Sequence, residues 1–244
     1  WSDELAAEPI FGNTLRLPSG VVEQLPGYES GDWWVQDAAA SLPVQLLNVA
    51  SGMTALDLCA APGGKTLQLA ALGAEVTALD RSNKRLGIVR SNLERTQLNA
   101  ELHATDANIW TSDGQFDRVL IDAPCSALGT LRRHPEGPWI KSLDALGRFP
   151  DIQAKLLRSG ASRVKPGGEL VYCVCTPIPA EGVNQIDAFL SDVSDFERLP
   201  ISGDEAGPFA PGITPNGDLV TSPSDLDDRG GADVFFISRL QRKA

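Results

Sequence analysis

Two cysteine-containing stretches hold the residues best suited to covalent chemistry. Cys125 follows Asp122 in "LIDAPCSALGTLRRHP", and Cys175 ends the apolar run of "ELVYCVCTP". A single cysteine at a strand end is usually a small buried hydrophobic group. Two at one sheet edge, one of them beside Asp122 and near Arg132 and Arg133, better fit a reactive site, because nearby cations stabilise thiolates.

The other cysteines do not suggest a metal site. Cys173 and Cys175 are separated by one residue rather than two, no second pair accompanies them, and the chain has only two histidines. A chain of 244 residues does not need disulfide staples. We therefore expect reduced thiols in a cytoplasmic protein that binds no metal.

Acidic residues end four consecutive predicted strands, and in open α/β sheets ligands bind beyond the carboxyl ends of the strands. They are Asp57, Asp80, Asp106 and Asp122. Asp80 lies about 20 residues past the first loop, where an acidic side chain accepts hydrogen bonds from ribose hydroxyls. Asp106 is placed to reach an adenine amino group. A lone aspartate at such a position is most simply a helix N-cap, but recurrence at successive strand ends favours a ligand site.

The stretch "DLCAAPGGKT" (57–66) ends like a nucleotide-triphosphate loop but fails its spacing, because Cys59 stands where the first glycine is required. Its small residues let the backbone approach a ligand closely. Because the loop lacks the spacing that binds phosphate groups, it suits a nucleoside that carries an amino acid instead of phosphates. This indicates S-adenosylmethionine.

Composition and charge fit a protein without membrane-spanning segments. Hydrophobic residues make up 42% of the chain, and no apolar run reaches the roughly 18 residues of a membrane helix. The net charge of −11 argues against nucleic-acid binding at first sight. However, residues 125–165 carry 8 basic and 3 acidic side chains, whereas 181–233 carry 2 basic and 12 acidic ones. A local basic surface can still attract phosphate.

The order of predicted elements indicates an α/β fold. Residues 1–34 form a hairpin-like lead-in, and 35–244 form one catalytic domain that is helical from about Asp37. Strands and helices then alternate, which predicts a mainly parallel, Rossmann-like sheet with helices on both faces. The strand-like stretches 195–201 and 233–240 lack a crossover helix and predict an antiparallel C-terminal hairpin, as in class I S-adenosylmethionine-dependent methyltransferases.

Four motifs together resemble those of the RNA cytosine-5 methyltransferases, most closely the Sun/Fmu branch that acts on bacterial 16S rRNA. They are "LDLCAAPGGKT", "ALDRS", "DAPCSALGTLRRHP" and "VYCVCTPIPAEG". The resemblance extends from about Gly31 to the C-terminus, and "RRHP" favours the rRNA branch over its tRNA relatives.

The resemblance implies a mechanism and a set of site residues. Cys175 would add to C6 of cytosine, Cys125 would assist release of the methylated base, and Asp122 would contact the ring edge and help to place the methyl donor. The target base would leave its stack to react. The cofactor would be held by Cys59, Ala60, Ala61, Pro62, Gly63, Gly64, Lys65, Asp80, Asp106 and Asp122. RNA would be contacted by Arg132, Arg133 and His134, although a turn role for His134 is equally open.

The sequence departs from the family pattern at several positions. Val174 and Thr176 flank Cys175 where Thr and Ser are usual, and Gly182 stands where Asn is common. Cys173 lies on the same strand face as Cys175, but the register with "VY" favours Cys175 as nucleophile. The rRNA branch normally carries an N-terminal NusB-like RNA-binding domain that nothing here resembles, and because the first residue is Trp we expect a truncated chain.

Other functions remain open at this stage. They are a tRNA cytosine-5 methyltransferase, a catalytically inactive RNA-binding or assembly factor, a small-molecule methyltransferase, and a DNA-type enzyme in which Cys125 attacks. The paired cysteines and the basic 125–165 stretch argue against a small-molecule enzyme, and the presence of both Cys125 and Cys175 argues against an inactive factor. We rank the rRNA enzyme first, the tRNA enzyme second and the inactive factor third.

Overall fold

The computed structural model describes residues 1–17, 20–111, 114–140 and 147–244. Its main sheet has the strand order β5-β4-β3-β6-β7-β10-β8, with the short β9 paired to β10. The strands are β3 (Thr54–Leu58), β4 (Glu75–Asp80), β5 (Glu101–Ala104), β6 (Phe116–Asp122), β7 (Val164–Val174), β8 (Phe196–Arg198), β9 (Leu219–Val220) and β10 (Phe236–Arg242). Strands β3 to β7 are parallel to one another, and β10 is antiparallel to both β7 and β8. The predicted α/β class with an antiparallel C-terminal pair is confirmed.

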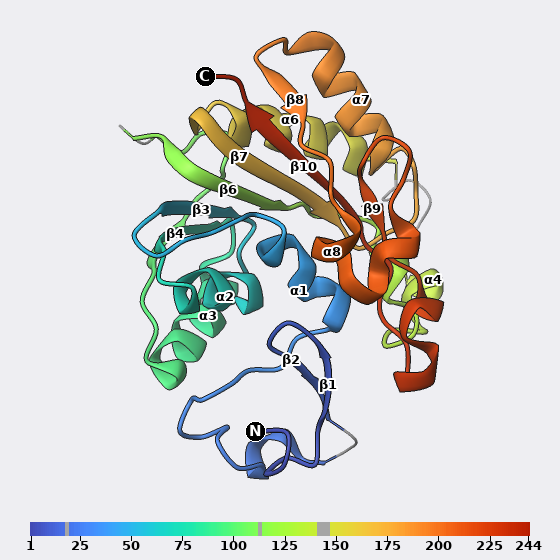
Figure 1. Cartoon of the computed structure of the whole chain (residues 1–244). Coiled ribbons are helices and arrows are strands. Elements are labelled where there is room, and N and C mark those ends of the chain that lie inside the picture. The colour runs from blue at the N-terminus through green and yellow to red at the C-terminus, as the bar shows by residue number, and fades with distance from the viewer. Residues whose placement is uncertain (18–19, 112–113, 141–146) are drawn as a thin grey trace.

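Helices cover both faces of this sheet (Figure 1). Helices α1 (Ala38–Gln45), α2 (Gly64–Ala71) and α3 (Asn83–Thr96) lie on one face, and α6 (Phe149–Ala161) and α7 (Val183–Asp192) on the other. Alternate residues of β6 show the period of two that such a sheet requires, because Leu120 packs in the core under α1 whereas Val119 and Ile121 pack in the core under α6. The sheet is thus buried on both sides.

Local sequence signals set the helix ends. The Asp37 carboxylate accepts a hydrogen bond from the Ala39 amide and begins α1. The Ser82 hydroxyl accepts one from the Arg85 amide and begins α3. These are N-caps, which supply partners for amides that have none within the helix. Of the helices predicted across 143–164, residues 143–146 lie outside the described part of the chain.

The N-terminal segment forms a small antiparallel hairpin of β1 (Glu8–Phe11) and β2 (Thr14–Arg16), followed by the short helix η1 (Val22–Gln24). It lies at the bottom of Figure 1, below α1. The segment between β8 and β10, in which the sequence shows no helical pattern, contains several short helices. It contains α8 (Gly203–Ala206), η3 (Gly207–Gly212) and η4 (Pro223–Arg229), and hydroxyl capping of Ser202 and Ser222 stabilises helices too short to show a periodic pattern.

No described helix combines the length and the apolar character needed to span a membrane. Between β6 and β7, η2 (Leu128–Thr130) and α4 (Gly137–Ile140) follow the first cysteine segment.

Candidate active site

The carboxyl ends of the parallel strands bring the predicted residues to one edge of the sheet. Asp80 and Asp122 are the last residues of β4 and β6, Asp57 is the last but one of β3, and Asp106 lies two residues past β5. Cys125 lies three residues beyond β6, and Cys175 directly follows β7. β6 and β7 are neighbours with Asp122 opposite Cys173, so the two cysteine segments leave the sheet side by side.

Asp80 organises the loop between β3 and α2. Its carboxylate accepts hydrogen bonds from the Ala61 and Ser82 amides, and it forms an ion pair with Arg85 at 3.2 Å. Arg85 also donates a hydrogen bond to the Ala61 carbonyl. Gly63 begins α2 with φ of +113°, a conformation that residues with a side chain rarely adopt. The side chain of Asp80 and the glycine at position 63 therefore hold this loop in place at the sheet edge.

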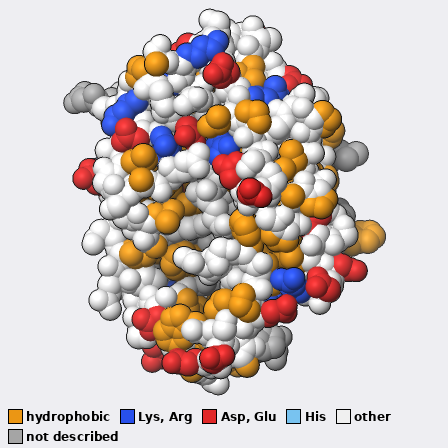
Figure 2. Space-filling model, viewed as in Figure 1, with side chains coloured by type: hydrophobic (Ala, Val, Ile, Leu, Met, Phe, Trp, Pro, Cys, Tyr) orange, Lys and Arg blue, Asp and Glu red, His pale blue; other side chains and the backbone are white. Residues whose placement is uncertain are grey.

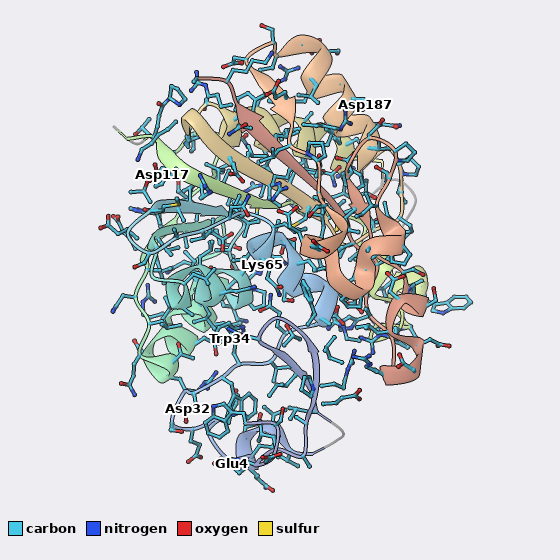
Figure 3. All side chains as sticks on the ribbon, viewed as in Figure 1. Glu4, Asp32, Trp34, Lys65, Asp117 and Asp187 are labelled. Atoms are coloured by element: carbon cyan, nitrogen blue, oxygen red, sulfur yellow. The ribbon has the colours of Figure 1, made fainter. Side chains whose placement is uncertain are left out.

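Lys65 and Asp122 form an ion pair at the centre of the site. The Lys65 ammonium lies 2.7 Å from Asp122 Oδ2 and 5.1 Å from the centre of the Phe235 ring. Figure 3 labels Lys65 near the middle of the molecule, between the sheet and α1. Burial lowers the pKa of Lys65, but the attraction of Asp122 outweighs it and raises the pKa above the usual value. Lys65 is therefore a fixed cation.

The thiols of Cys125 and Cys175 are in contact, with 3.3 Å between their Sγ atoms. One thiol can therefore donate a hydrogen bond to the other. Donation from Cys125 stabilises the charged form of Cys175 and lowers its pKa, whereas the same bond, together with burial, raises the pKa of Cys125. Cys175 is thus the thiol that ionises first.

Cys173 and Cys59 have environments that disfavour a thiolate. Cys173 is fully buried, burial raises its pKa, and its Sγ lies 3.5 Å from Asp122 Oδ1 as a donor. Burial also raises the pKa of Cys59. Cys175 is only half-buried, so its greater exposure favours it over Cys173 as the predicted nucleophile.

Asp57 is completely buried beneath the loop. Its Oδ2 accepts a hydrogen bond from the Thr66 hydroxyl at 2.7 Å, but within the described residues Oδ1 has no partner. Burial raises the pKa of Asp57 to about 7. A buried carboxylate oxygen without a donor is unfavourable, so this atom is suited to a donor from a ligand.

Comparison with known proteins identifies the family to which this chain belongs. The family model described as 16S rRNA methyltransferase RsmB/F matches residues 44–241. The chain belongs to this family. The ribosomal RNA small subunit methyltransferase B of Yersinia pseudotuberculosis serotype O:1b is 43% identical over 241 residues, which cover 96% of this chain and 53% of that protein. The protein of the same name from Pseudomonas syringae pv. tomato is 40% identical over 225 residues, which cover 90% of this chain and 49% of that protein.

The chain thus spans about half the length of these curated relatives. Among solved structures, a methyltransferase homolog protein from Pyrococcus horikoshii superposes with a TM-score of 0.74 at 27% identity, over 93% of this chain and 74% of that one. The structure of NSun6 from the same organism, solved with SFG, superposes with a TM-score of 0.78 at 24% identity, over 94% of this chain and 59% of that one. At this identity the likeness shows only that the two proteins share a fold. The resemblance to the Sun/Fmu branch is confirmed.

Of the three residues expected to contact RNA, the two arginines are paired with aspartates and the histidine is exposed. Arg132 pairs with Asp37 at 2.8 Å and with Asp233 at 3.5 Å, and Arg133 forms a 2.5 Å ion pair with the buried Asp233. His134 is exposed and lies 3.3 Å from Glu136. Both arginines therefore form ion pairs within the protein, with the N-cap of α1 and with Asp233, which lies three residues before β10. On the face shown in Figure 2, basic side chains are interspersed with acidic ones.

Gly182, where this RsmB/F chain departs from the expected Asn, is explained by packing. A Cβ at this position would lie 2.9 Å from the Phe236 ring, closer than real Cβ contacts allow. Gly182 and Phe236 also line a cavity of about 190 Å³ next to Thr176, the residue that follows the predicted nucleophile. The larger Asn would require the ring to move.

Two site residues were missed by sequence analysis. Gln153 on α6 and Glu181, just before α7, are buried and bind the backbone beside Cys125. The "AEG" that contains Glu181 lay within a quoted motif, but nothing in its local pattern distinguishes a buried carboxylate from a solvated one. Gln153 lies on an ordinary amphipathic helix and carries no signal at all.

Proposed function

We propose that this chain is a catalytic domain that transfers a methyl group from S-adenosylmethionine to C5 of a cytosine in RNA, most specifically 16S rRNA. The observation that carries the proposal is the contact of the Cys125 and Cys175 thiols, 3.3 Å apart, beside the Lys65–Asp122 ion pair. A small-molecule methyltransferase has no use for paired thiols. Membership of the RsmB/F family supports RNA as the substrate, and the curated relatives named for small-subunit rRNA support 16S rRNA.

The residues present fit S-adenosylmethionine. The cofactor has a cationic amino group and ribose hydroxyls, and both donate hydrogen bonds. Asp57 offers a buried acceptor without a partner among the described residues, and Asp80 and Asp106 offer further carboxylates at neighbouring strand ends. The loop from Cys59 to Gly64 has only small side chains, so its backbone can lie close to a ligand. When bound, the cofactor supplies an electrophilic methyl group.

The chemistry requires a nucleophile because C5 of cytosine is weakly nucleophilic. The Cys175 thiolate forms a bond to C6, and the electron pair of the C5–C6 double bond then becomes available at C5 to attack a methyl carbon. Afterwards the proton on C5 leaves to solvent, the double bond re-forms, and the Cys175–C6 bond breaks with its electrons returning to sulfur. The Cys125 thiol assists by donating a hydrogen bond to that departing sulfur.

Lys65 and Asp122 complete the pocket for the base. The Asp122 carboxylate is held on one oxygen by Lys65 and approached on the other by the Cys173 thiol. A carboxylate fixed in this way can accept a hydrogen bond from the exocyclic amino group of cytosine. Preorganised groups of this kind act without reorganisation during the reaction.

An exposed aromatic side chain supports binding of unstacked RNA. Trp139 on α4 is 88% exposed and follows the first cysteine segment along the chain. Bases released from a stack bind well to aromatic faces. This observation, together with the pairing of Arg132 and Arg133 to carboxylates, favours a stacking contribution over a purely ionic one.

The proposal is tested by methyl transfer. The chain is incubated with methyl-labelled S-adenosylmethionine and either a 16S rRNA transcript, partly assembled small subunits, or tRNA, and the product nucleoside is identified by mass spectrometry. We expect 5-methylcytidine in an rRNA substrate and none with Cys175→Ala. Cofactor binding, measured by calorimetry, serves as the control for folding. Binding of the cofactor without transfer to any RNA would contradict the proposal, and transfer to tRNA alone would reassign the substrate.

A further inference from the structure

Gln153 and Glu181 form a buried polar pair between the two cysteine segments. Gln153 is fully buried on α6, and Glu181 is 1% exposed in the turn between β7 and α7. Gln153 Nε2 donates a hydrogen bond to Glu181 Oε2 at 2.9 Å. Neither residue has a part in the chemistry described above. A buried carboxylate is unfavourable unless donors surround it, so its presence here calls for a structural or functional reason.

The pair holds the backbone on both sides of Cys125. Gln153 Nε2 also donates to the carbonyl of Pro124 at 3.0 Å, directly before the cysteine. The amide of Ser126, directly after it, donates to Glu181 Oε2 at 2.9 Å. These two bonds restrain Cys125 from both neighbours, although the segment itself belongs to no helix or strand.

The same pair is attached to the segment that carries Cys175. The Tyr172 hydroxyl, on β7, donates to the Glu181 carbonyl at 2.6 Å. The Ser126 hydroxyl donates to the Thr176 hydroxyl at 2.7 Å, directly after Cys175. The carboxylate, the side-chain amide and these three hydroxyls therefore connect α6, β7 and both cysteine segments in one buried network.

We infer that Gln153 and Glu181 are positioning residues that hold the Cys125 thiol in contact with Cys175. Strand β7 positions Cys175, which directly follows it, and the network positions Cys125 next to Cys175. Two backbone hydrogen bonds also tie the segment that contains Cys125 to β7 and to Cys175, from the Ala123 amide to the Cys173 carbonyl and from the Gly129 amide to the Cys175 carbonyl, but they lie two and four residues from Cys125. The network restrains the residues directly before and after Cys125, whose sulfur lies 3.3 Å from that of Cys175. Hydrogen bonding by Cys125 favours the Cys175 thiolate and lowers the pKa of Cys175, so the network also raises the fraction of Cys175 that is ionised at a given pH. The consequence for turnover rests on the proposed function, whereas the thiol contact belongs to the free protein.

The test follows alkylation of Cys175 in the free protein. Iodoacetamide reacts with the thiolate, so the rate of modification against pH gives the pKa of Cys175. The rate is measured under reducing conditions by mass spectrometry, with fragmentation to separate Cys175 from Cys173. Gln153→Met removes the donor and keeps the side-chain length, and Glu181→Ala removes the acceptor. We expect both to move the midpoint upward by about one pH unit, which corresponds to losing one hydrogen bond to a charged group.

Two variants separate positioning from general loosening. Glu181→Gln keeps an acceptor oxygen for Gln153 and Ser126, and it should retain the wild-type midpoint. Leu157→Ala opens a cavity in the core under α6 without touching the network, and it too should leave the midpoint unchanged. A folded Gln153→Met protein with the wild-type midpoint would overturn the inference. An equal shift in Leu157→Ala would do the same, because any disturbance of α6 would then suffice.

Turnover provides the second readout, with 16S rRNA as substrate. The two disruptive variants should lower kcat with KM for S-adenosylmethionine unchanged, and the rate should recover as the pH rises toward the new thiol midpoint. A loss that higher pH does not relieve would show a role other than positioning. If the wild-type chain methylates no RNA, the proposed function fails, while the alkylation midpoints still decide the inference.

Discussion

Replacement of the buried Asp57 by Asn should remove a pH dependence of stability. The raised pKa means that, between the ordinary aspartate value of 3.8 and about 7, the folded protein retains a proton that the unfolded chain releases. The free energy of unfolding of the wild type therefore falls as the pH rises through this window, and it stays low above pH 7. Asn does not titrate, so the variant escapes this loss.

The magnitude follows from the size of the shift. Each unit of pKa difference corresponds to about 1.4 kcal/mol, so a shift from 3.8 to about 7 amounts to about 4 kcal/mol over the whole window. Between pH 5 and pH 8 the variant should gain about 3 kcal/mol relative to the wild type. Because Oδ1 has no partner among the described residues, the new amide group loses no existing hydrogen bond there.

The assay is urea unfolding followed by tryptophan fluorescence, at half-unit steps from pH 5 to pH 8. Asp117→Asn is a control of opposite sign, because a hydrogen bond from Lys165 lowers the pKa of Asp117 to about 2. The Asp117 carboxylate of the wild type stabilises the fold above pH 4 and loses that effect only as the pH falls toward 2. The difference in free energy of unfolding between Asp117→Asn and the wild type should therefore be constant from pH 5 to pH 8. A difference for Asp57→Asn that is equally constant would refute the reasoning.

Two further predictions concern the base pocket and the RNA surface. Asp122→Ala leaves the Lys65 ammonium buried without its partner and should reduce the free energy of unfolding by about 3 kcal/mol, whereas the double variant with Lys65→Met should recover most of that loss in the same urea assay. A double variant as unstable as Asp122→Ala would show that the unpaired charge is not the cause. Trp139→Ala should weaken RNA binding roughly 5- to 150-fold in a filter-binding assay, the range for loss of one base stacked on an aromatic ring, and leave the affinity for S-adenosylmethionine unchanged. Unchanged RNA affinity would place the RNA elsewhere.

The sheet and the placement of the strand-end residues were predictable because their signals are local. The alternation of strands with helices predicted the parallel sheet, and Asp80 and Asp122 end β4 and β6 as expected. Since parallel strands share one carboxyl edge, the meeting of Cys125 and Cys175 followed from their positions after β6 and β7.

What could not be predicted depends on contacts between residues distant in the chain. The contact of Arg133 with RNA stays a prediction, but the pairing of its guanidinium with Asp233, 100 residues away in an acidic stretch with no sign of burial, could not be foreseen. Gln153 meets Pro124 across 29 residues, and Glu181 meets Ser126 across 55. Hydrophobic periodicity reports which face of an element is buried, but not which polar side chain will find a partner there.

The most direct test of the central claim, that Cys175 attacks and Cys125 assists release, is covalent trapping on RNA that contains 5-fluorocytosine. Fluorine at C5 cannot leave as a proton does, so an enzyme that adds to C6 remains attached after methyl transfer. The chain, Cys175→Ala and Cys125→Ala are each incubated with this RNA and S-adenosylmethionine, and adducts are resolved by denaturing electrophoresis. The account predicts an adduct with the wild type and with Cys125→Ala and none with Cys175→Ala. An adduct that persists in Cys175→Ala and disappears in Cys125→Ala would contradict it.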